Sequence, residues 1–252
     1  MRSNPCIFLP WDSSFFGLRI GRLKGGHLSE PLLAEALDWC GSQEIDCLYF
    51  LADSNHAETI RLAEYNAFQL VDIRVALTLV PSPEENQHAM ANGIRLFKEA
   101  DLDCLKAIAR QSHSDSRFYF DGRFPKERCD DLFETWIERS CQGWAAAVFV
   151  GELDGAVAGY CSCHFEGDAG SIGLMAIAPQ AQGRSLGRCL VGAAISYAKS
   201  RGISRLNVVT QGRNVRAQRL YQKCGFVTES VRLWYHKWFG RTEHPLPQDS
   251  DE

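Results

Sequence analysis

Apolar and polar positions alternate along the chain with two different periods, and the changes between them predict helices and strands. Residues 32–43 and 56–68 repeat apolar positions at helical spacing, and the apolar run 45–52 between them is typical of a buried strand. Residues 69–80 alternate with period two, which predicts a strand. One expected face carries Val71, Ile73, Val75, Leu77 and Leu79, and the other carries Asp72, Arg74, Ala76 and Thr78.

A polar segment with two prolines, "PSPEENQHAMANG" at residues 81–93, interrupts this pattern and reads as a linker. We therefore expect a small N-terminal α/β module at 1–82, a linker at 83–92 and a second domain at 93–240. The polar residues 241–252 are expected to form a loose acidic tail.

Beyond the linker the pattern predicts a strand, two helices, three strands, a helix, a strand, a helix and a strand. These are expected at residues 93–100, 102–112, 128–141, 144–153, 156–167, 169–179, 187–202, 204–210, within 210–226, and 230–239. Asp101 is placed to cap the helix that begins at residue 102. Asp154-Gly155 predicts a hairpin. The order favours the α/β (α+β) class, with a mixed central sheet and helices on both of its faces.

Residues 113–127, "HSDSRFYFDGRFPKE", are expected to form a loop rich in arginine and aromatic side chains. Such a loop can bind a phosphorylated, flat ligand, because arginine offers paired donors to phosphate and aromatic rings stack on bases. The alternative is that the aromatic side chains simply anchor the loop on the sheet. The sequence leaves both interpretations open.

The composition limits the possible partners. Hydrophobic residues make up 45% of the chain, which is enough for a core, and the net charge is −4. This charge predicts no general attraction to nucleic acid or to a membrane surface. The ten cysteines include no CxxC pair, so we expect no metal site. The N-terminus lacks a signal-like apolar run and no stretch is long enough to span a membrane, so we expect a cytoplasmic protein with reduced thiols.

The stretch from Met175 to Val191 carries the strongest chemical signal. A buried strand ends at Pro179, and Gly183 and Gly187 flank the start of a helix. Glycines here let backbone N–H groups crowd an anion, and the helix N-terminus adds free donors, which predicts a phosphate cradle. The spacing is neither that of a P-loop nor that of a dinucleotide fingerprint. From the glycine pair alone, an ordinary strand–loop–helix turn explains the stretch equally well.

Asn214 and Tyr221 are seven residues apart in "TQGRNVRAQRLYQKCGF", so they lie on nearly the same face of a helix. Asn214 is at the expected N-cap. Tyr221 is either a core aromatic or a functional phenol. The first interpretation is supported by the apolar neighbours Leu220 and Cys224.

The strand, the "QxxG" turn, the helix and the later "NxxAxxLYxxxGF" together resemble the GNAT superfamily of N-acetyltransferases, over residues 93–239. The resemblance implies a GNAT fold and acetyl-CoA as the acetyl donor. Ser185 departs from the family pattern, which has Gly or Ala there. By this resemblance the pantetheine arm pairs with the backbone of Leu174, Met175, Ala176 and Ile177. The pyrophosphate is expected on the amides of Gln182, Gly183, Arg184, Ser185, Leu186 and Gly187, with charge added by Arg184 and Arg188.

The same resemblance implies that Asn214 touches the CoA arm and that Tyr221 is the general acid that protonates the leaving thiolate. The cysteines are then bystanders, because the amine attacks the thioester directly within a ternary complex.

Three further islands, "WDSSFFG" at 11–17, "AFQLVD" at 67–72 and "SRF" at 116–118, resemble the narrower family of TDP-fucosamine acetyltransferases. That family acetylates the 4-amino group of a dTDP-4-amino-4,6-dideoxyhexose. The small-molecule amine substrate is then an amino-sugar nucleotide, and a homodimer is possible by family likeness. Asp72 matches an acidic position and is a candidate base, acting directly or through water, although a solvated carboxylate on the polar strand face explains it too. The candidate substrate-binding residues are Arg117, Phe118, Tyr119 and Arg123.

Two other functions stay open. Another GNAT enzyme would acetylate a peptide N-terminus, a polyamine or an antibiotic amine. A non-catalytic GNAT-fold module would bind CoA without transferring the acetyl group.

Overall fold

The computed structural model describes residues 4–81 and 93–240, so the predicted linker at 83–92 and tail at 241–252 lie outside the described residues. The chain forms two compact units. Unit 1 comprises Met1–Arg74, Ser116–Arg128 and Val231–Glu252, and unit 2 comprises Val75–Asp115 and Cys129–Ser230. Strands β4 (Gln69–Leu79) and β10 (Val227–Trp238) each pass from one unit to the other. Each unit therefore contains segments that are distant in sequence.

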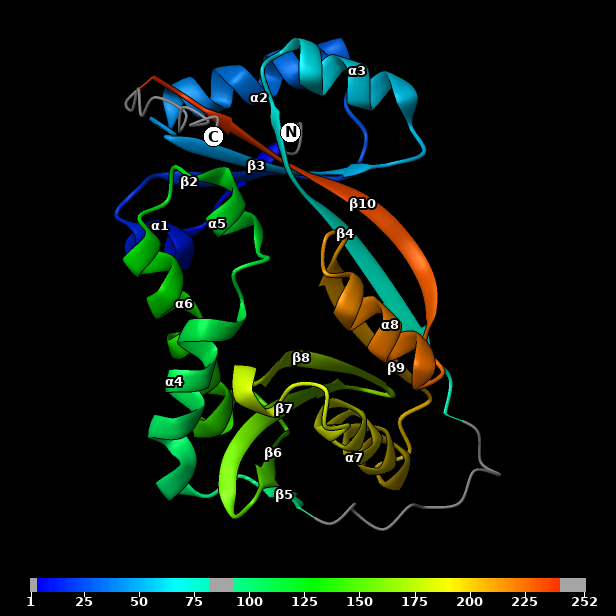
Figure 1. The fold of residues 1–252 in the computed structure, drawn as a ribbon. Helices are drawn as coiled ribbons and strands as arrows, with labels where there is room; N and C mark the ends of the chain where they lie inside the picture. The colour runs from blue at the N-terminus through cyan, green and yellow to red at the C-terminus, as the bar shows by residue number, and fades with distance from the viewer. Residues whose placement is uncertain (1–3, 82–92, 241–252) are drawn as a thin grey trace, which may run out of the picture. The chain divides into compact units, whose positions relative to one another are not determined.

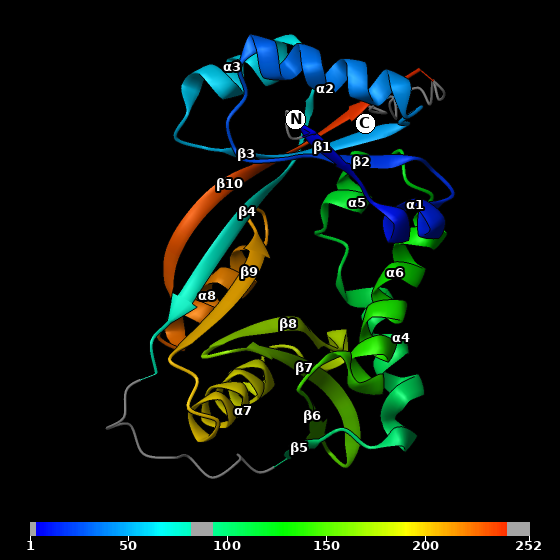
Figure 2. The same cartoon turned by 180° about the vertical axis from the view of Figure 1, so that it is seen from behind.

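Unit 1 is a sheet with helices on both faces. Its own elements are β1 (Cys6–Phe8), α1 (Pro10–Phe16), β2 (Ile20–Leu23), α2 (Glu30–Ser42), β3 (Cys47–Asp53), α3 (Ala57–Tyr65) and α5 (Arg117–Asp121). The strand order is β1-β2-β3-β10-β4. β2 runs parallel to β3, and β10 runs antiparallel to β3. Helices α2 and α3 cover one face of this sheet, and α1 and α5 lie against the other (Figures 1 and 2).

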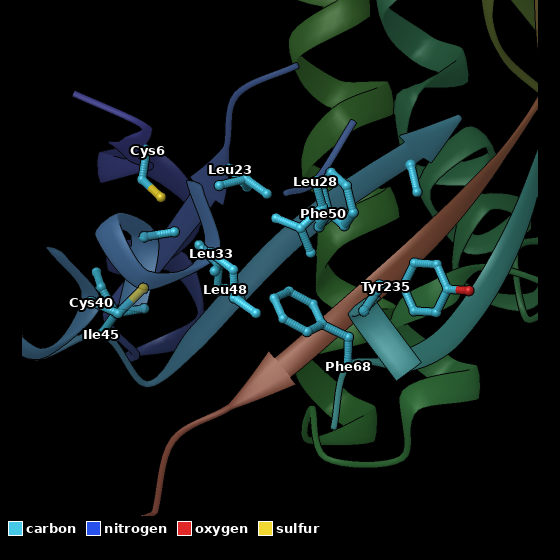
Figure 3. Close-up of a cluster of buried hydrophobic side chains, with 13 residues drawn as sticks. Cys6, Leu23, Leu28, Leu33, Cys40, Ile45, Leu48, Phe50, Phe68 and Tyr235 are labelled. Carbon is cyan, nitrogen blue, oxygen red and sulfur yellow. The ribbon is translucent and has the colours of Figure 1, made fainter. Parts of the chain in front are cut away.

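The core of unit 1 lies between α2, α3 and the sheet (Figure 3). α2 begins at the N-cap Ser29, whose side chain accepts a hydrogen bond from the Leu32 N–H, and Pro31 occupies its first turn. The helix then turns Leu33, Ala36 and Cys40 inward. These side chains pack against β3, where every residue from 47 to 50 is buried. A strand buried on both faces reads as a continuous apolar run, as the sequence indicated.

Unit 2 contains the remaining elements, and the strand order in its part of the sheet is β4-β9-β8-β7-β6-β5. They are β5 (Ile94–Leu96), α4 (Leu102–Ser112), α6 (Lys126–Arg139), β6 (Ala147–Leu153), β7 (Ala156–Glu166), β8 (Ala169–Ile177), α7 (Leu186–Ser200), β9 (Arg205–Gln211) and α8 (Val215–Lys223), and α6 begins within the sequence range of unit 1. Short 3-10 or π turns span Glu99–Asp101, Ser140–Trp144 and Pro179–Ala181. The predicted hairpin is confirmed, because Asp154 and Gly155 both have positive φ and join antiparallel strands β6 and β7.

The two faces of β7 carry different helices. On one face Phe165 stacks on Tyr197 of α7, with ring centroids 5.6 Å apart. On the other face the Tyr160 hydroxyl lies 2.9 Å from Nε2 of His113, at the C-terminal end of α4. Because side chains alternate along a strand, α7 and α4 must cover opposite faces. The predicted mixed sheet with helices on both faces is thus confirmed.

Several local expectations were wrong. The predicted loop 113–127 contains the short helix α5, and the N-terminal 23 residues contain β1, α1 and β2, which the pattern did not predict. The alternation expected for β4 fails because Asp72 and Ala76 are buried while Ile73 is exposed. Asp101 does not cap α4 with its side chain, because its carboxylate instead accepts hydrogen bonds from Arg95 and from the Lys98 N–H.

Among the helices of residues 4–81 and 93–240, none combines the length and the apolar character that crossing a bilayer requires.

Candidate active site

The middle of β8 in unit 2 is irregular. The register of β7 against β8 shifts between Cys161 and Cys163, so Ser162 stands opposite two residues, Gly173 and Leu174. The Ser162 Oγ accepts a hydrogen bond of 2.8 Å from the Leu174 N–H. This is a β-bulge, and a bulge bends its strand away from the neighbour on the other side.

Beyond the bulge, β8 loses one of its two partners. Its parallel ladder with β9 ends at Ile172, whereas its pairing with β7 continues to Ile177. The Ala178 N–H donates to β7, and neighbouring residues point their backbone groups to opposite sides. The backbone groups of Met175 and Ile177 therefore face an edge that, in the described residues, no strand covers. Among the four residues predicted to pair with pantetheine, these two turn their backbone groups to that edge, where the Ile177 carbonyl already accepts one hydrogen bond of 3.3 Å from the Gln182 side chain.

The turn between β8 and α7 presents a row of exposed backbone donors. The N–H groups of residues 183–187 have no acceptor within the described part of the chain. Gly183 and Ser185 both adopt left-handed backbone conformations, with φ of 79° and 62°. Left-handed residues between right-handed ones turn successive N–H groups to one side, which makes an anion-binding concavity. The first turn of α7 continues this row of donors.

The polar side chains around this turn are tied to protein partners. Arg184 forms a 2.8 Å ion pair with Asp154 in the β6–β7 hairpin, at the surface. The Gln182 side chain accepts a hydrogen bond from Arg216 and donates one of 3.3 Å to the Ile177 carbonyl. Gln182 thus connects α8 to the end of β8. The sequence reasoning missed Arg216, although its place two residues after a predicted N-cap could have indicated it.

Gly187 explains how the first turn of α7 approaches its neighbours. A Cβ atom at this position would lie 3.1 Å from Leu220 Cδ2 and 3.3 Å from Met175 Cε. A larger residue here would require the Leu220 and Met175 side chains to shift. Arg188 follows on the exposed side of the helix, within electrostatic range of Cys224. Burial raises the pKa of the Cys224 thiol, and the positive charge of Arg188 partly offsets this rise.

Asn214 is the N-cap of α8, as predicted. Its side-chain oxygen accepts a hydrogen bond of 3.0 Å from the Ala217 N–H. Its amide nitrogen has no protein partner among the described residues. One end of this side chain therefore fixes the helix, and the other end remains able to donate to a ligand.

Tyr221 is buried on the inner face of α8, with a relative exposure of 6%. Its hydroxyl lies 3.7 Å from the Sδ of Met175, and a thioether is a weak acceptor. Burial raises the pKa of Tyr221 above its ordinary value, and Cys161 and Cys224 act in the same direction. The phenol therefore holds its proton across the neutral range and points it at a sulfur atom beside the open edge of β8.

In unit 1, Asp72 lies where the sequence did not place it. The side chain is 5% exposed, and its Oδ1 accepts a hydrogen bond of 2.8 Å from the Ile73 N–H. The expectation of a solvated carboxylate is wrong, because the Asp72 side chain is buried on a strand that has a neighbouring strand on each side.

Arg117 at the start of α5 has an unusual environment in unit 1. Its guanidinium carbon lies 4.5 Å from the ring centroids of Tyr49 and Phe118 and 4.2 Å from that of Trp234. No hydrogen bond or ion pair joins it to any described residue. Burial lowers the pKa of Arg117, while Tyr49 and Asp12 oppose this. The three rings hold the cation by cation–π contacts.

The other residues of the predicted substrate loop are arranged differently. Phe118 is buried and packs against Phe16 and Phe124, with centroids 5.3 and 5.4 Å apart. Arg123 lies over the Trp238 ring at 5.6 Å, and Tyr119 is partly buried. The aromatic side chains therefore anchor this loop on unit 1, as the simpler interpretation expected for Phe118, and a role of the loop in binding remains a prediction.

A buried polar pair lies near this loop and was not predicted. His236 Nδ1 contacts the Asp121 carboxylate, and both side chains are fully buried. The Trp238 indole N–H donates to the same carboxylate oxygen at 3.1 Å. Burial lowers the pKa of His236 to about 4, although Asp121 opposes this. In the sequence, a histidine between the aromatic residues of "WYHKW" was the available signal.

Across residues 4–81 and 93–240, the His, Cys, Asp and Glu side chains form no group of three suited to hold a metal ion.

Comparisons with known proteins agree with the geometry of unit 2. Residues 109–226 match the family described as "Acetyltransferase (GNAT) family". The chain is 27% identical over 233 residues to a dTDP-fucosamine acetyltransferase of Escherichia coli O6:H1, covering 91% of this chain and 96% of that protein. It is 29% identical over 141 residues to the spore coat polysaccharide biosynthesis protein SpsD of Bacillus subtilis, covering 56% of this chain and 49% of that protein.

The fold also matches solved structures. A GCN5-related N-acetyltransferase from Sphaerobacter thermophilus superposes with a TM-score of 0.65, at 15% identity, over 92% of this chain and 76% of its own. This likeness extends through both units and supports the GNAT fold alone. Together with the bulged strand, the free amides of the turn and the family match, it leads to one assignment: the chain carries a GNAT acetyltransferase domain and is an acetyl-transferring enzyme that uses acetyl-CoA.

Proposed function

We propose that this enzyme transfers the acetyl group of acetyl-CoA to the 4-amino group of a dTDP-4-amino-4,6-dideoxyhexose. The observation that carries the proposal is the similarity to a dTDP-fucosamine acetyltransferase, which spans 91% of this chain and so includes unit 1 as well as the acetyltransferase domain. SpsD, the other sugar-related relative, is named for polysaccharide biosynthesis. An acceptor built on a sugar is consistent with both names.

The donor fits the open edge of β8 and the turn that follows it. The free N–H groups of residues 183–187 would hold the pyrophosphate of acetyl-CoA. The backbone groups of Met175 and Ile177 would pair with the amides of the pantetheine arm, as an added strand does. The free amide nitrogen of Asn214 would donate to the same arm. These contacts would place the thioester beside the Tyr221 phenol.

The proposed reaction needs no covalent enzyme intermediate. The lone pair of the neutral amine attacks the thioester carbonyl carbon, so that a C–N bond forms and the C–S bond breaks. The sulfur leaves as a thiolate and takes a proton from Tyr221, and the nitrogen loses its extra proton to a base. Asp72 is our candidate for that base, acting directly or through a water molecule. The products are the amide and free CoA, and the proton on the base returns to the Tyr221 phenolate through solvent, so that atoms and charges balance.

A different amine is the alternative acceptor. Other members of this broad family acetylate peptides, polyamines or antibiotics, and the donor site would be the same for all of them. The difference lies in the charge of the acceptor. A sugar nucleotide needs cationic side chains for its phosphates, and unit 1 offers Arg117 without an acidic partner in the described residues. This observation favours a phosphorylated acceptor.

The test is a thiol-release assay with purified enzyme, acetyl-CoA and a panel of amines. The panel contains amino-sugar nucleotides with the amine at different ring positions, polyamines and peptides with free N-termini. We expect CoA release with the 4-amino sugar nucleotide at least about tenfold above that with any other amine. Release with peptides or polyamines only would disprove the proposed substrate and leave the acetyltransferase assignment intact.

A further inference from the structure

Arginine side chains that lie among aromatic rings usually also donate to a carboxylate or a carbonyl oxygen. Arg117 in unit 1, whose residue is partly exposed, has the rings but no such acceptor. Its guanidinium lies between the rings of Tyr49, Phe118 and Trp234, and it has no hydrogen bond or ion pair with any described residue. A guanidinium has five N–H donors in a fixed fork. Aromatic rings accept no conventional hydrogen bond from these donors, so the donors have no oxygen acceptor among the described residues.

A second donor on the same group of residues is also unsatisfied. The Tyr49 side chain is 1% exposed, and its hydroxyl has no hydrogen-bond partner. This hydroxyl belongs to one of the rings that the Arg117 guanidinium covers. A guanidinium can only donate, so it cannot satisfy the donor of the hydroxyl. The two groups together therefore lack an acceptor.

Nearby carboxylates do not fill this role. The charges of Asp12 and Asp72 both favour the cationic form of Arg117, so both lie within its electrostatic range. Neither forms an ion pair with it. Asp12 is partly buried, and this burial raises the pKa of its carboxyl group. The two carboxylates hold the guanidinium electrostatically while its donors remain available.

We infer that Arg117 and Tyr49 form a phosphate-binding subsite in unit 1, which holds the diphosphate of the acceptor and selects nucleotide-linked amines. The inference rests on the proposed function for the identity of the acceptor. An arginine pairs with a phosphate through two parallel N–H···O bonds, and a tyrosine hydroxyl can donate a third bond. Because the aromatic rings already fix the guanidinium, little further ordering of this side chain is required on binding.

The subsite also defines a selectivity. A phosphorylated ligand supplies the acceptor that both donors lack, whereas a polyamine supplies none. A polyamine would also add positive charge beside a guanidinium. The carboxylates of Asp12 and Asp72 oppose the phosphates, so they moderate the affinity for the anion. Removal of one of these charges should therefore tighten binding.

The experiment is titration calorimetry with thymidine diphosphate as the probe. All titrations are run with CoA at saturating concentration, so that the exposed amides of residues 183–187 are occupied and cannot bind the probe. We expect binding by the wild-type enzyme and at least about tenfold weaker binding by Arg117→Met. Tyr49→Phe removes a single hydroxyl and should weaken binding by roughly threefold to tenfold. Asp12→Asn should tighten it.

The matched control is Arg19→Gln. Arg19 also lies over an aromatic ring of unit 1, that of Phe8, at 5.2 Å, but its Nε already donates to the Gln43 carbonyl. We expect thymidine diphosphate to bind this variant as it binds the wild type. Circular dichroism checks the folding of every variant, and Tyr49→Phe tests the inference even if Arg117→Met fails to fold.

Equal affinity of the wild type and folded Arg117→Met would overturn the subsite. If Arg117→Met does not fold, equal affinity of the wild type and Tyr49→Phe would overturn it. Absence of binding to the CoA-saturated wild type would do the same. Failure of the proposed function is a separate outcome: thymidine diphosphate would bind in an Arg117-dependent way, but no amino-sugar nucleotide would be acetylated. If the enzyme acetylates the amino-sugar nucleotide and thymidine diphosphate does not inhibit this reaction, the proposed function stands and the phosphate-binding subsite is disproved.

Discussion

At the scale of single residues, Tyr221 combines two properties that rarely occur together in a core aromatic. It is buried, which keeps its proton in place, and the partner of its hydroxyl is a thioether, which accepts weakly. A stronger acceptor would compete for this proton. A thiolate is a stronger acceptor than a thioether, so a departing CoA sulfur near Met175 would take over the hydrogen bond. The same contact that packs the ring therefore leaves the proton available.

We predict that Tyr221→Phe will reduce kcat by about 10²-fold to 10⁴-fold, the usual range for loss of a general acid. Affinity for acetyl-CoA, measured by calorimetry, should stay within about twofold, because the donor contacts come from the backbone of the turn. The fold should also remain, since the lost hydroxyl has only a thioether partner. Turnover close to that of the wild type would exclude Tyr221 as the acid.

The unsatisfied hydroxyl of Tyr49 predicts an unusual stability effect. A buried donor without a partner costs about 1–3 kcal/mol, and the Tyr49 hydroxyl has none. Tyr49→Phe should therefore leave the free energy of unfolding unchanged or raise it by about 1 kcal/mol. The matched control is Tyr235→Phe, because the Tyr235 hydroxyl donates to Glu64 at 3.1 Å and its loss should cost about 1–2 kcal/mol. Urea unfolding measures both, and equal losses in the two variants would contradict the prediction.

Residue roles could be anticipated where a local rule decides them. Asn214 was predicted as an N-cap because capping depends on a few neighbouring residues. Asp72 was placed on a solvated face because strand alternation says nothing about what covers each face. The environment of Arg117 could not be predicted, since its three rings come from sequence positions as distant as Tyr49 and Trp234.

At the scale of elements, the bulge in β8 connects sequence to function. It depends on Ser162, whose hydroxyl accepts the Leu174 N–H and so satisfies the group that the bulge removes from the ladder. On the same strand the ladder with β9 ends at Ile172. The open edge of Met175 and Ile177 thus follows from one irregularity in the pairing. A regular strand would have continued along β9 and covered this edge.

We predict that Ser162→Ala will destabilise the enzyme by about 1–2 kcal/mol, because it leaves a backbone donor without its acceptor. It should also raise the KM for acetyl-CoA severalfold, since the edge that receives the pantetheine arm would relax. Ser171→Ala is the control, as Ser171 lies on the same strand and its hydroxyl has no hydrogen bond with a described residue. A KM equal to that of Ser171→Ala would show that the bulge does not shape the donor site.

Most elements of unit 2 were predictable because each carries a local signal. The boundaries of α4 at Leu102 and Ser112 match the predicted range, and the Asp154-Gly155 turn fixed the β6–β7 hairpin. The bulge was not predicted, since it depends on the register between two strands. The turn before α7 was predicted from its glycines, but the left-handed conformation of Ser185 was not. Serine rarely adopts this conformation, and the row of amides requires it there.

At the scale of the whole molecule, the division into units differs from the order of the sequence. Unit 1 contains Ser116–Arg128 and the segment from Val231, although both follow the predicted linker. Local patterns could not reveal this, because it results from pairing of β10 with β3, whose partners, from Arg232 with Asp53 to Trp238 with Cys47, are 179 to 191 positions apart in the sequence. Substitutions in either late segment should therefore alter unit 1. The candidate substrate residues belong to that unit for the same reason.

The acid stability of the enzyme offers a test of how unit 2 is packed. His113 stacks on Phe133 with centroids 4.4 Å apart, and its Nε2 lies 2.9 Å from the Tyr160 hydroxyl. Burial lowers the pKa of His113 from 6.5 to about 4. The folded state thus binds this proton less readily than the unfolded state does. As the pH falls from 6.5 towards 4, His113 becomes protonated in the unfolded chain but stays neutral in the folded chain. The free energy of unfolding therefore decreases over this interval.

We expect this histidine to cost the folded state up to about 3 kcal/mol by pH 4 relative to pH 7. His113→Gln keeps a hydrogen-bonding side chain but cannot titrate, so its stability should fall less steeply over the same interval. Urea unfolding at pH 7, 5.5 and 4.5 measures the difference between wild type and variant, and that difference should shift in favour of the variant as the pH falls. A constant difference would mean that His113 takes up a proton in the folded enzyme as readily as in the unfolded chain, and that the contact between α4 and β7 does not shield this partly buried histidine.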